Sequence, residues 1–550
     1  MNLNRDILRL AVPSILANIT VPLVGMVDIA VAGHLGAAGG LSAAALIGGV
    51  SIGSMLFDML YWNFGFLRAG TGGLTAQAYG RLRGLCPLLS PAAFASSTTF
   101  ARKRPGPGRA PDGALSDLRE EGVREAARDI ASTLGRAVAM AMASGMGLVA
   151  LQWVVVQVAF LLVNCSPEVQ TLATQYFYIR IWAAPATLSL FAFKGWFIGM
   201  QDTVRPMVCD LLVNAVNIVL SIALAFGAGA LPALGFKGIA WGTFFAQWTG
   251  FLYALLAVRH RYGALFLQEH QEHGRGNENA LQRATVKTPA RTGEQKEAET
   301  FPTECYSTAA GTKTPQNVPA EGPAKTDRGW RAFFTLNRDL FLRSLCMVAV
   351  YIGFTMMAAR FGNMMLAVST ILMKLLMIFS YFTDGFAYAG EALTGRFIGE
   401  RSREGVLSTI RGTFLWSLGV TGLFFLVYGA GGVPLLRLMT SDQEVVASAR
   451  TFLPWLLLMP VIGCPAFTWD GIFIGATASK DLRDSVAWCV VGFFAVWFIG
   501  ISLLKAVHET VPETLAIHLL MAAYFTHLAI RALYLTFRWR SILPEGNERT

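Results

Sequence analysis

The stretch Gly65-Phe66-Leu67-Arg68-Ala69-Gly70 in the first half of the chain has a counterpart in the second half, Gly385-Phe386-Ala387-Tyr388-Ala389-Gly390. Other matches follow in the same order: Leu74-Thr75 with Leu393-Thr394, Gly80 with Gly399, and Phe197-Ile198-Gly199 with Phe473-Ile474-Gly475. The chain is therefore an internal duplication. In membrane proteins, two such halves around a central site are typical of transporters.

The composition places most of the chain in a lipid bilayer. Hydrophobic residues make up 54% of the 550 residues and charged residues 15%, whereas soluble domains have about 25% charged residues. The net charge of +10 raises the alternative of nucleic acid binding. The basic residues lie between apolar runs without interleaved aromatic residues, so the positive-inside rule explains them better. We expect lipid, and no nucleic acid, as a partner.

Cysteine and histidine residues predict neither disulfides nor a metal site. The seven cysteines are scattered and form no CxxC pair. Cys346, Cys464 and Cys489 lie in apolar runs, where free cysteine is an ordinary packing residue. His270 and His273 lie in a polar stretch without a second ligand pair, and we expect them to be solvated. The N-terminus lacks a cleavable signal pattern, so its first apolar run is expected to stay as a membrane helix.

Length and apolarity predict about twelve spanning helices, six in each half. The expected fold class is all-α, a polytopic membrane protein with two pseudo-symmetric six-helix lobes around a central cavity. The predicted spans are 7–32, 41–67, 129–162, 169–199, 205–229, 237–258, 334–360, 364–395, 405–436, 445–475, 483–506 and 513–537.

Two polar segments interrupt this pattern, 84–122 and 263–330. Both are rich in polar residues, glycine and proline and lack an apolar period, so we predict that they are disordered. A passive linker or a docking and regulatory role would both fit. The parts that remain are an N-lobe of residues 1–83 and 123–262, a C-lobe of 331–540 and a tail of 541–550.

The basic residues near the span ends predict the topology. If the helices alternate, they gather on one side of the membrane, which the positive-inside rule assigns to the cytoplasm together with both termini and both polar segments. The residues are Arg5, Arg9, Arg81, Arg83, Arg205, Arg259, Arg261, Arg401, Arg403, Lys480, Arg483, Arg538 and Arg540.

Asp28 is the clearest functional candidate in the N-lobe. It lies within an apolar stretch and has no basic residue within a helical turn. An ionisable group at bilayer depth costs about 2.5–3.5 kcal/mol, so it usually faces a cavity or a partner and marks a functional site. A carboxyl group in such a place can load and release a proton, although it can also be an aspartate held by water or backbone groups. Pro13 and Pro22 precede it and permit bending as hinges.

Other polar residues at depth allow more than one role. Asp58 and Arg68 are ten residues apart, too far for pairing within a helix, so each is expected to meet another helix in a structural pair. Asn214 and Asn217 share one face of the fifth span and either line a cavity or connect helices. We expect Arg180 and Arg360 to snorkel to an interface.

The second half carries its own acidic residues. Asp384 and Glu391 are two turns apart on one face of the eighth span, and Lys374 is too far along the helix to pair with Asp384. Asp470 precedes a glycine, as does its repeat counterpart of opposite charge, Lys194. Those two side chains either pair across the boundary between the halves or line a cavity separately.

Motifs of enzymes and ATP-driven pumps are missing from the sequence. It contains no GxxxxGK[ST] loop and no HExxH element. We therefore expect no enzyme and no organic cofactor, and an ion gradient as the source of energy.

The stretch Val27-Asp28-Ile29-Ala30-Val31-Ala32-Gly33-His34-Leu35-Gly36 resembles the first-helix signature of the multidrug and toxin extrusion (MATE) family, in its DinF-like branch. Further similar stretches are 62–68, 75–78, 195–201, 384–393 and 469–475. The resemblance covers the chain except the two polar segments and the extreme C-terminus.

The resemblance implies an antiporter in a bacterial-type inner membrane. It would export organic, often cationic or amphipathic compounds, driven by inward flow of H⁺ or Na⁺, and we expect a monomer. The aspartate central to coupling in the family corresponds to Asp28, the early proline of a bending helix to Pro13, and a supporting asparagine to Asn217.

The chain departs from the family at one position of this site. Well-described members have a second acidic residue one turn after the asparagine, where this chain has Ser221. Because a Na⁺ site wants several oxygen ligands with adequate negative charge, this difference favours H⁺. Glu391 with Asp384 is then a candidate for a second cation or substrate site.

The alternative function is a lipid or lipid-linked oligosaccharide flippase of the same superfamily fold. Such a protein would need a basic cavity for phosphate-bearing headgroups, and a cavity lined by Arg68, Lys194 and Lys374 would favour it. The several acidic residues at depth and the count of about twelve spans favour export of organic compounds instead.

Overall fold

The computed structural model describes residues 3–38, 42–85, 112–162, 165–228, 232–285, 325–439, 443–509 and 511–544. Helices account for the regular structure of these residues, and they contain no strand. The predicted all-α fold class is therefore confirmed. His270 and His273 lie in a helix, but their side chains fall outside the described part of the structure.

The N-lobe and C-lobe divide the helices between them. The N-lobe has α1 (Leu3–Ala38), α2 (Ala43–Trp62), α3 (Gly65–Leu85), α5 (Asp112–Ala150), α6 (Gln152–Leu162), α7 (Pro167–Arg180), η2 (Ile181–Ala183), α8 (Ala184–Gly199), α9 (Val204–Phe226) and α10 (Phe236–Thr285). The C-lobe has α11 (Lys325–Ala359), α12 (Gly362–Gly399), α13 (Arg403–Met439), α14 (Gln443–Arg450), α15 (Leu453–Gly475), α16 (Ser479–Val507), α17 (Glu513–Arg538) and η3 (Trp539–Ile542).

Eleven candidate spans are long and apolar enough to cross a bilayer in the described residues. The helix α10, which packs along α9 in the N-lobe, occupies the place of the sixth span of that lobe. The total agrees with the prediction of about twelve spans.

Several predicted spans are divided into two helices. The predicted span 41–67 consists of α2 and α3 and continues to Leu85, and 169–199 consists of α7, η2 and α8. The first break follows Asn63, whose side chain donates to the carbonyl of Met59 at 2.7 Å and so competes with the helix ladder. The second lies next to Pro185 in the first turn of α8, because proline cannot donate to the preceding turn.

The two polar segments are helical at their edges. Residues 112–122 belong to α5, and residues 263–285 and 325–330 extend α10 and α11. The prediction of disorder is therefore wrong at these edges. They are helical because the helices of the neighbouring spans continue past their apolar parts. The remaining residues, 86–111 and 286–324, lie outside the described residues.

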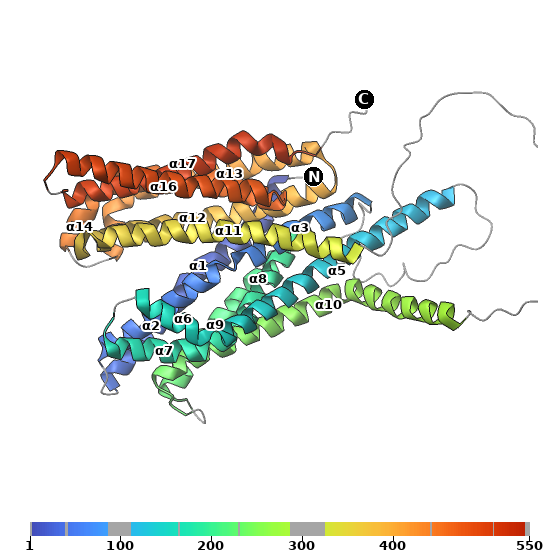
Figure 1. The fold of residues 1–550 in the computed structure, drawn as a ribbon, viewed down its shortest axis with the longest axis horizontal. Coiled ribbons are helices and arrows are strands. Elements are labelled where there is room, and N and C mark those ends of the chain that lie inside the picture. Colours follow the sequence, from blue (N-terminus) through green and yellow to red (C-terminus); the bar gives the residue numbers. More distant parts are fainter. Residues whose placement is uncertain are drawn as a thin grey trace, which may run out of the picture.

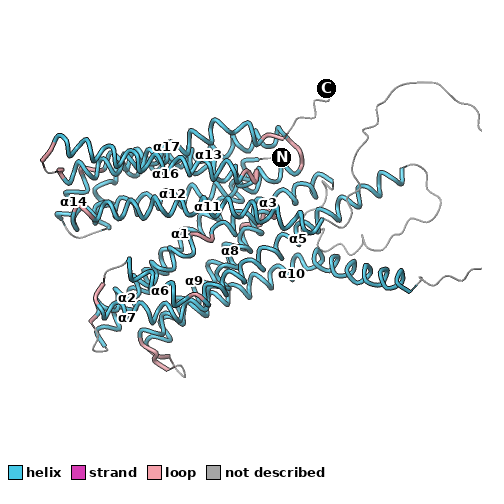
Figure 2. Tube along the Cα trace, viewed as in Figure 1, coloured by secondary structure: helices cyan, strands magenta, loops and turns pink. Residues whose placement is uncertain are grey.

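The two lobes approach each other at one end of the bundle and diverge toward the other (Figures 1 and 2). The approach is made by α1 and α3 of the N-lobe, which pack on α12 of the C-lobe, with a further contact between α3 and α15. We call the end of the bundle that holds Gly80 and Gly399 the closed end. The N-terminus of α1 lies there, as Figure 1 shows.

Glycines make this close approach possible. A Cβ atom on Gly80 would collide with the backbone carbonyl of Arg396, and one on Gly399 would collide with the carbonyl of Gln77. These glycines are matched positions of the duplication, so the repeat places a small residue on each side of the crossing between α3 and α12. Small residues at such a crossing let membrane helices approach at backbone distance.

The repeated Phe-Ile-Gly stretches end helices at the same closed end. The residues two positions after their glycines, Gln201, Arg401 and Thr477, have φ values of 59°, 56° and 54°. Each donates its backbone N–H back to the preceding isoleucine carbonyl at 2.9 to 3.0 Å. This left-handed cap reverses the chain within a few residues, so that α9, α13 and α16 begin beside the helices that precede them.

We predict that Gly80→Val lowers the free energy of unfolding by about 1–3 kcal/mol, because the added atoms force α3 and α12 apart. Thermal unfolding in detergent measures the change. Gly135→Ala on α5 is the matched control, since a Cβ atom there meets nothing within 4 Å. It should leave stability unchanged or raise it by up to about 1 kcal/mol. Equal melting temperatures for Gly80→Val and the unsubstituted protein would contradict the role of this crossing.

Candidate functional site

Asp28 lies inside the N-lobe, on α1. Its side chain is 4% exposed, and its Oδ1 atom has no hydrogen-bond partner. The Ser221 hydroxyl on α9 is within hydrogen-bonding reach of the carboxylate, and Arg180 is the cation whose charge acts on it. The structure therefore brings together Asp28 and Ser221, which lie on different helices.

The two asparagines of α9 connect this helix to its neighbours. Asn217 donates from Nδ2 to the Thr243 hydroxyl on α10 at 2.8 Å, and Asn214 donates to the Thr20 hydroxyl on α1 at 2.9 Å. Asn217 is buried, and its Oδ1 atom has no partner. The N-lobe site thus contains two buried acceptor oxygens without donors, one on Asp28 and one on Asn217.

Arg180 is held inside the N-lobe, so the prediction that it reaches an interface is wrong. Its guanidinium donates to the Tyr176 hydroxyl at 3.0 Å and to the Ser54 hydroxyl at 3.3 Å. It also lies over the Phe57 ring, 4.7 Å from the centroid. Sequence analysis missed this role because an arginine that ends an apolar run next to Trp182 has the pattern of an interface anchor.

Asp58 meets charges on other helices, as expected. Its side chain is exposed, and the cations whose charges act on it are Arg180 of the N-lobe and Lys374 on α12. Lys374 is exposed as well. On the same face of α2 as Asp58, one turn later, the Trp62 ring packs edge-on against Tyr351 of α11 at 5.2 Å. The charged face of α2 is therefore turned toward the C-lobe.

Helix α1 runs unbroken through Pro13 and Pro22. Because Pro13 has no N–H, the carbonyl of Arg9 lacks its helical donor. The Thr203 hydroxyl at the start of α9 donates to that carbonyl at 3.3 Å instead. The hinge role of these prolines stays a prediction, and the side chain of Pro22 lies outside the described residues.

The lobes are joined by an ion pair between Arg68 on α3 and Glu391 on α12. The distance from Arg68 Nη1 to Glu391 Oε2 is 3.0 Å, and Glu391 is fully buried. The Tyr388 ring lies beneath the guanidinium, 4.4 Å from the centroid. Gly72 faces Glu391 Oε1, and that oxygen has no hydrogen-bond partner. The expected structural pairing of Arg68 with another helix is confirmed.

Asp384 and Glu391 share the face of α12 that is turned toward Arg68. The cations whose charges act on Asp384 are Arg68, Arg531 and Arg343, and Ser380 is within hydrogen-bonding reach of it. The two acids therefore face arginines rather than forming a purely acidic cluster.

Asp470 and Lys194 do not pair with each other. Lys194 Nζ lies 2.5 Å from Asp210 Oδ1 within the N-lobe. Asp470 pairs with Arg343 of α11 and with Arg531 of α17 within the C-lobe. Pairing across the boundary between the halves, one of the two alternatives, is therefore wrong. Sequence analysis missed Asp210, and it also missed Arg343 and Arg531, although an arginine in the middle of an apolar run was a signal.

The charges at depth balance in sign. The acidic residues described above are Asp28, Asp58, Asp210, Asp384, Glu391 and Asp470. The basic residues are Arg68, Arg180, Lys194, Arg343, Lys374 and Arg531. Arg68 and Lys194 each have an acidic partner, and Lys374 faces Asp58. A flippase would need Arg68, Lys194 and Lys374 together in one cavity. Each of them instead faces a different acidic residue.

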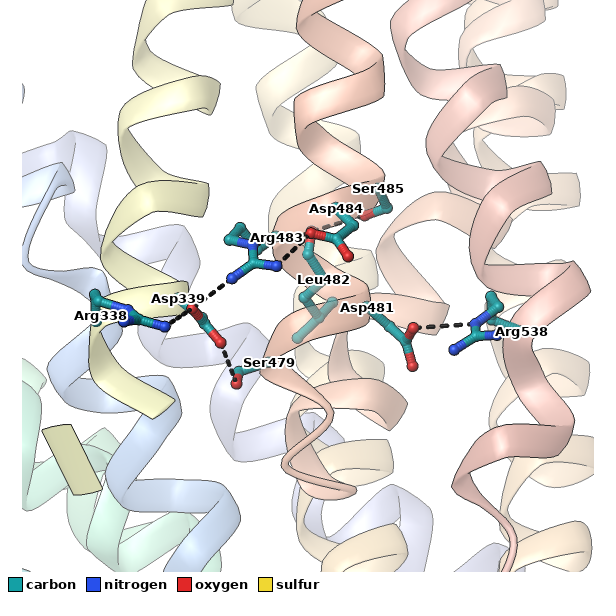
Figure 3. Close-up of polar contacts among 9 residues, drawn as sticks. All are labelled: Arg338, Asp339, Ser479, Asp481, Leu482, Arg483, Asp484, Ser485 and Arg538. Atoms are coloured by element: carbon teal, nitrogen blue, oxygen red, sulfur yellow. Dashed lines mark hydrogen bonds and ion pairs between the residues drawn. The ribbon is translucent and has the colours of Figure 1, made fainter. Parts of the chain in front are cut away.

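A separate network of charged residues joins helices of the C-lobe near the closed end (Figure 3). Asp339 of α11 accepts from Arg483 at 2.8 Å, and the Ser479 hydroxyl donates to it at 3.3 Å. Arg538 of α17 donates to Asp481 at 3.0 Å. Because these residues join α11, α16 and α17, the network holds the lobe together and does not belong to the candidate site.

Comparison with known proteins gives consistent matches. The family model MatE matches residues 125–223 and 340–499. The chain is 30% identical over 536 residues to DNA damage-inducible protein F of Escherichia coli (strain K12), which covers 97% of this chain and 91% of the relative. The Vibrio cholerae MATE transporter VcmN in its bent form has a TM-score of 0.66 at 14% identity, covering 98% of this chain and 97% of that one.

A second solved structure agrees in fold. A multidrug resistance MATE family transporter of the MOP superfamily, in an outward-facing conformation, has a TM-score of 0.65 at 15% identity. The match covers 100% of this chain and 98% of the other.

We predict that Arg68→Met destabilises the protein by about 3–5 kcal/mol, because Glu391 is then buried without a counter-charge. The double variant Arg68→Met/Glu391→Met should recover most of this loss in a thermal unfolding assay. Arg81→Met is the control: its pair with Asp129 is 46% exposed on both sides, so the loss should stay under about 1 kcal/mol. A double variant no more stable than Arg68→Met would show that the pair does not act as a unit.

Proposed function

This chain belongs to the MatE family of membrane transporters, and from that premise we propose that it is an ion-coupled antiporter that exports organic, often cationic or amphipathic compounds. It is a multi-pass membrane protein and a transporter rather than an enzyme. One observation carries the proposal: a carboxylate, Asp28, is buried inside one lobe with an oxygen that has no partner.

The proposed role of Asp28 is to load and release the coupling ion. A proton on the carboxyl group removes a charge from a site where charge is costly, and gives the group a donor of its own. The neighbouring Asn217 Oδ1 also lacks a donor. The site is therefore short of hydrogen-bond donors in its charged form and gains one when a proton binds.

The ligand chemistry supports H⁺ over Na⁺ as the coupling ion. The groups at the site supply one carboxylate, the Ser221 hydroxyl and the Asn217 amide oxygen. Hard cations such as Na⁺ prefer several oxygen ligands with adequate negative charge.

The proposed transport cycle is alternating access of two lobes. The duplication supplies similar halves, and the Arg68–Glu391 pair and the glycine crossing join them at the closed end. Arg81 and Arg83 lie near the closed end, on α3, so the positive-inside rule supports placing that end in the cytoplasm, together with both termini. In this orientation the divergent end faces outward, in a bacterial-type inner membrane.

The remaining parts of the proposal concern partners. We propose a monomer with small organic compounds and the lipid bilayer as partners and no organic cofactor. The lipid flippase is less well supported, because Arg68, Lys194 and Lys374 each face an acidic residue.

We predict that Asp28→Asn abolishes ion-coupled transport, because an amide cannot exchange a proton, while the protein still folds. The assay is dissipation of an imposed pH gradient by a panel of organic cations and amphipathic compounds in proteoliposomes, with and without Na⁺. Asp129→Asn, at an exposed residue, is the matched control and should keep full activity. Transport by Asp28→Asn at the unsubstituted rate would remove Asp28 from the coupling step.

We predict that Ser221→Asp makes transport depend on Na⁺, because it places a second carboxylate beside Asp28. Initial rates of substrate efflux at increasing Na⁺ concentration test this. Ser221→Asn is the size-matched control without the added charge, and its transport should not depend on Na⁺. A Na⁺ requirement already present in the unsubstituted protein would overturn the preference for H⁺.

A further inference from the structure

Helix α13 carries hydroxyl side chains on its buried face. Thr409, Thr413, Ser417 and Thr421 recur every four residues and are 0%, 0%, 0% and 7% exposed. The opposite face carries exposed leucines such as Leu415. The hydroxyls therefore point into the C-lobe, against α12 and α15, and not toward lipid.

Two further hydroxyls face this line from neighbouring helices. Thr394 of α12 and Thr468 of α15 are both fully buried. We call the set Thr394, Thr409, Thr413, Ser417, Thr421 and Thr468 the hydroxyl row.

Contacts between side chains join the three helices along this row. Thr413 packs on Gly390 of α12, with its Oγ1 atom 3.7 Å from the position of a Cβ there. The Thr421 hydroxyl donates to the carbonyl of Ser417 on its own helix at 2.9 Å and lies 3.4 Å from the carbonyl of Pro460 on α15. The thiol of Cys464, also on α15, lies beside Thr421 and Thr468.

Four hydroxyls of the row have no partner: those of Thr394, Thr413, Ser417 and Thr468. Serine and threonine in a helix commonly donate to the carbonyl four residues earlier, as Thr409 does to Gly405 at 2.8 Å. These four make no such bond. A buried polar group without a partner costs about 1–3 kcal/mol, and ordered water is the usual partner of such groups.

The prolines of α15 add acceptors beside the row. Pro460 and Pro465 lie inside the helix, and neither can donate to the carbonyl of the preceding turn. Membrane helices tolerate such prolines because hydroxyl side chains and ordered water satisfy the freed groups. The carbonyls freed in this way are those of Leu456 and Val461, four residues before each proline, and the four unpartnered hydroxyls lie on α15 and its neighbours α12 and α13.

We propose that the hydroxyl row is a binding site for a chain of water molecules buried inside the C-lobe. The row itself carries no charge, so a neutral ligand that both donates and accepts fits it better than an ion. Residues 409 to 421 extend over about 18 Å of helix at 1.5 Å per residue. The site does not depend on the proposed function.

Radiolytic oxidation in ¹⁸O-labelled water tests the proposal on the full-length protein in nanodiscs, because oxidation requires water next to the oxidised side chain. Cys464 is 0% exposed and lies beside the row, while Cys209 is 2% exposed and packs against the carbonyl of Gly250. We expect Cys464 to take up ¹⁸O several-fold faster than Cys209. Equal slow rates would mean that the row is dry and would overturn the proposal.

A triple variant, Thr413→Val/Ser417→Ala/Thr468→Val, gives an independent measurement. If water fills the row, Cys464 labelling should fall to the level of Cys209 and the melting temperature should fall. A dry row predicts the reverse, a higher melting temperature, because unpaired hydroxyls are removed. Thr370→Val, at an exposed residue of α12, is the control and should change neither readout.

A cation in the row is the competing outcome. In that case the melting temperature of the unsubstituted protein would depend on Na⁺ or K⁺, and the triple variant would lose this dependence. Such a result would overturn the proposal of water. If the triple variant does not fold, the comparison of Cys464 with Cys209 decides alone.

Discussion

The ion pair between Arg68 and Glu391 lies where the two lobes touch, and the rest of the arrangement depends on it. Glu391 is fully buried, so its charge is tolerated only while Arg68 remains beside it. Gly72 leaves room for the carboxylate, and the Tyr388 ring supports the guanidinium. Any movement that separates the lobes at the closed end must break or rearrange this pair. The pair therefore sets a barrier between the conformation described here and one open at that end.

The bilayer explains why the other charges are distributed as they are. Lys194 and Asp470 occupy matched positions of the duplication but pair with Asp210 on one side and with Arg343 and Arg531 on the other. Lys194 and Asp470 are thus each neutralised within their own lobe, whereas the buried Glu391 pairs with Arg68 of the other lobe. Asp28 has no ion pair among the described residues, and one of its carboxylate oxygens has no hydrogen-bond partner.

Local patterns predicted much of the fold correctly. Apolar runs longer than a bilayer crossing predicted about twelve spans, and the repeated motifs predicted two similar halves. The breaks within spans were missed, because Asn63 and the short turn before Pro185 interrupt the hydrogen-bond ladder without interrupting the apolar pattern. Arg180 was assigned to an interface for a similar reason: its place in the sequence does not reveal that Ser54 and Tyr176 lie beside it.

The sequence by itself determined the membrane class, the duplication and the family, because these follow from composition, period and local motif. Only the tertiary structure decided which charges meet. Arg68 and Glu391 are 323 residues apart in the chain, and Ser221 reaches Asp28 from another helix. Such partners depend on where helices cross and how each is rotated about its axis. A period of 3.6 residues specifies the faces of one helix, but not which distant helix each face will meet.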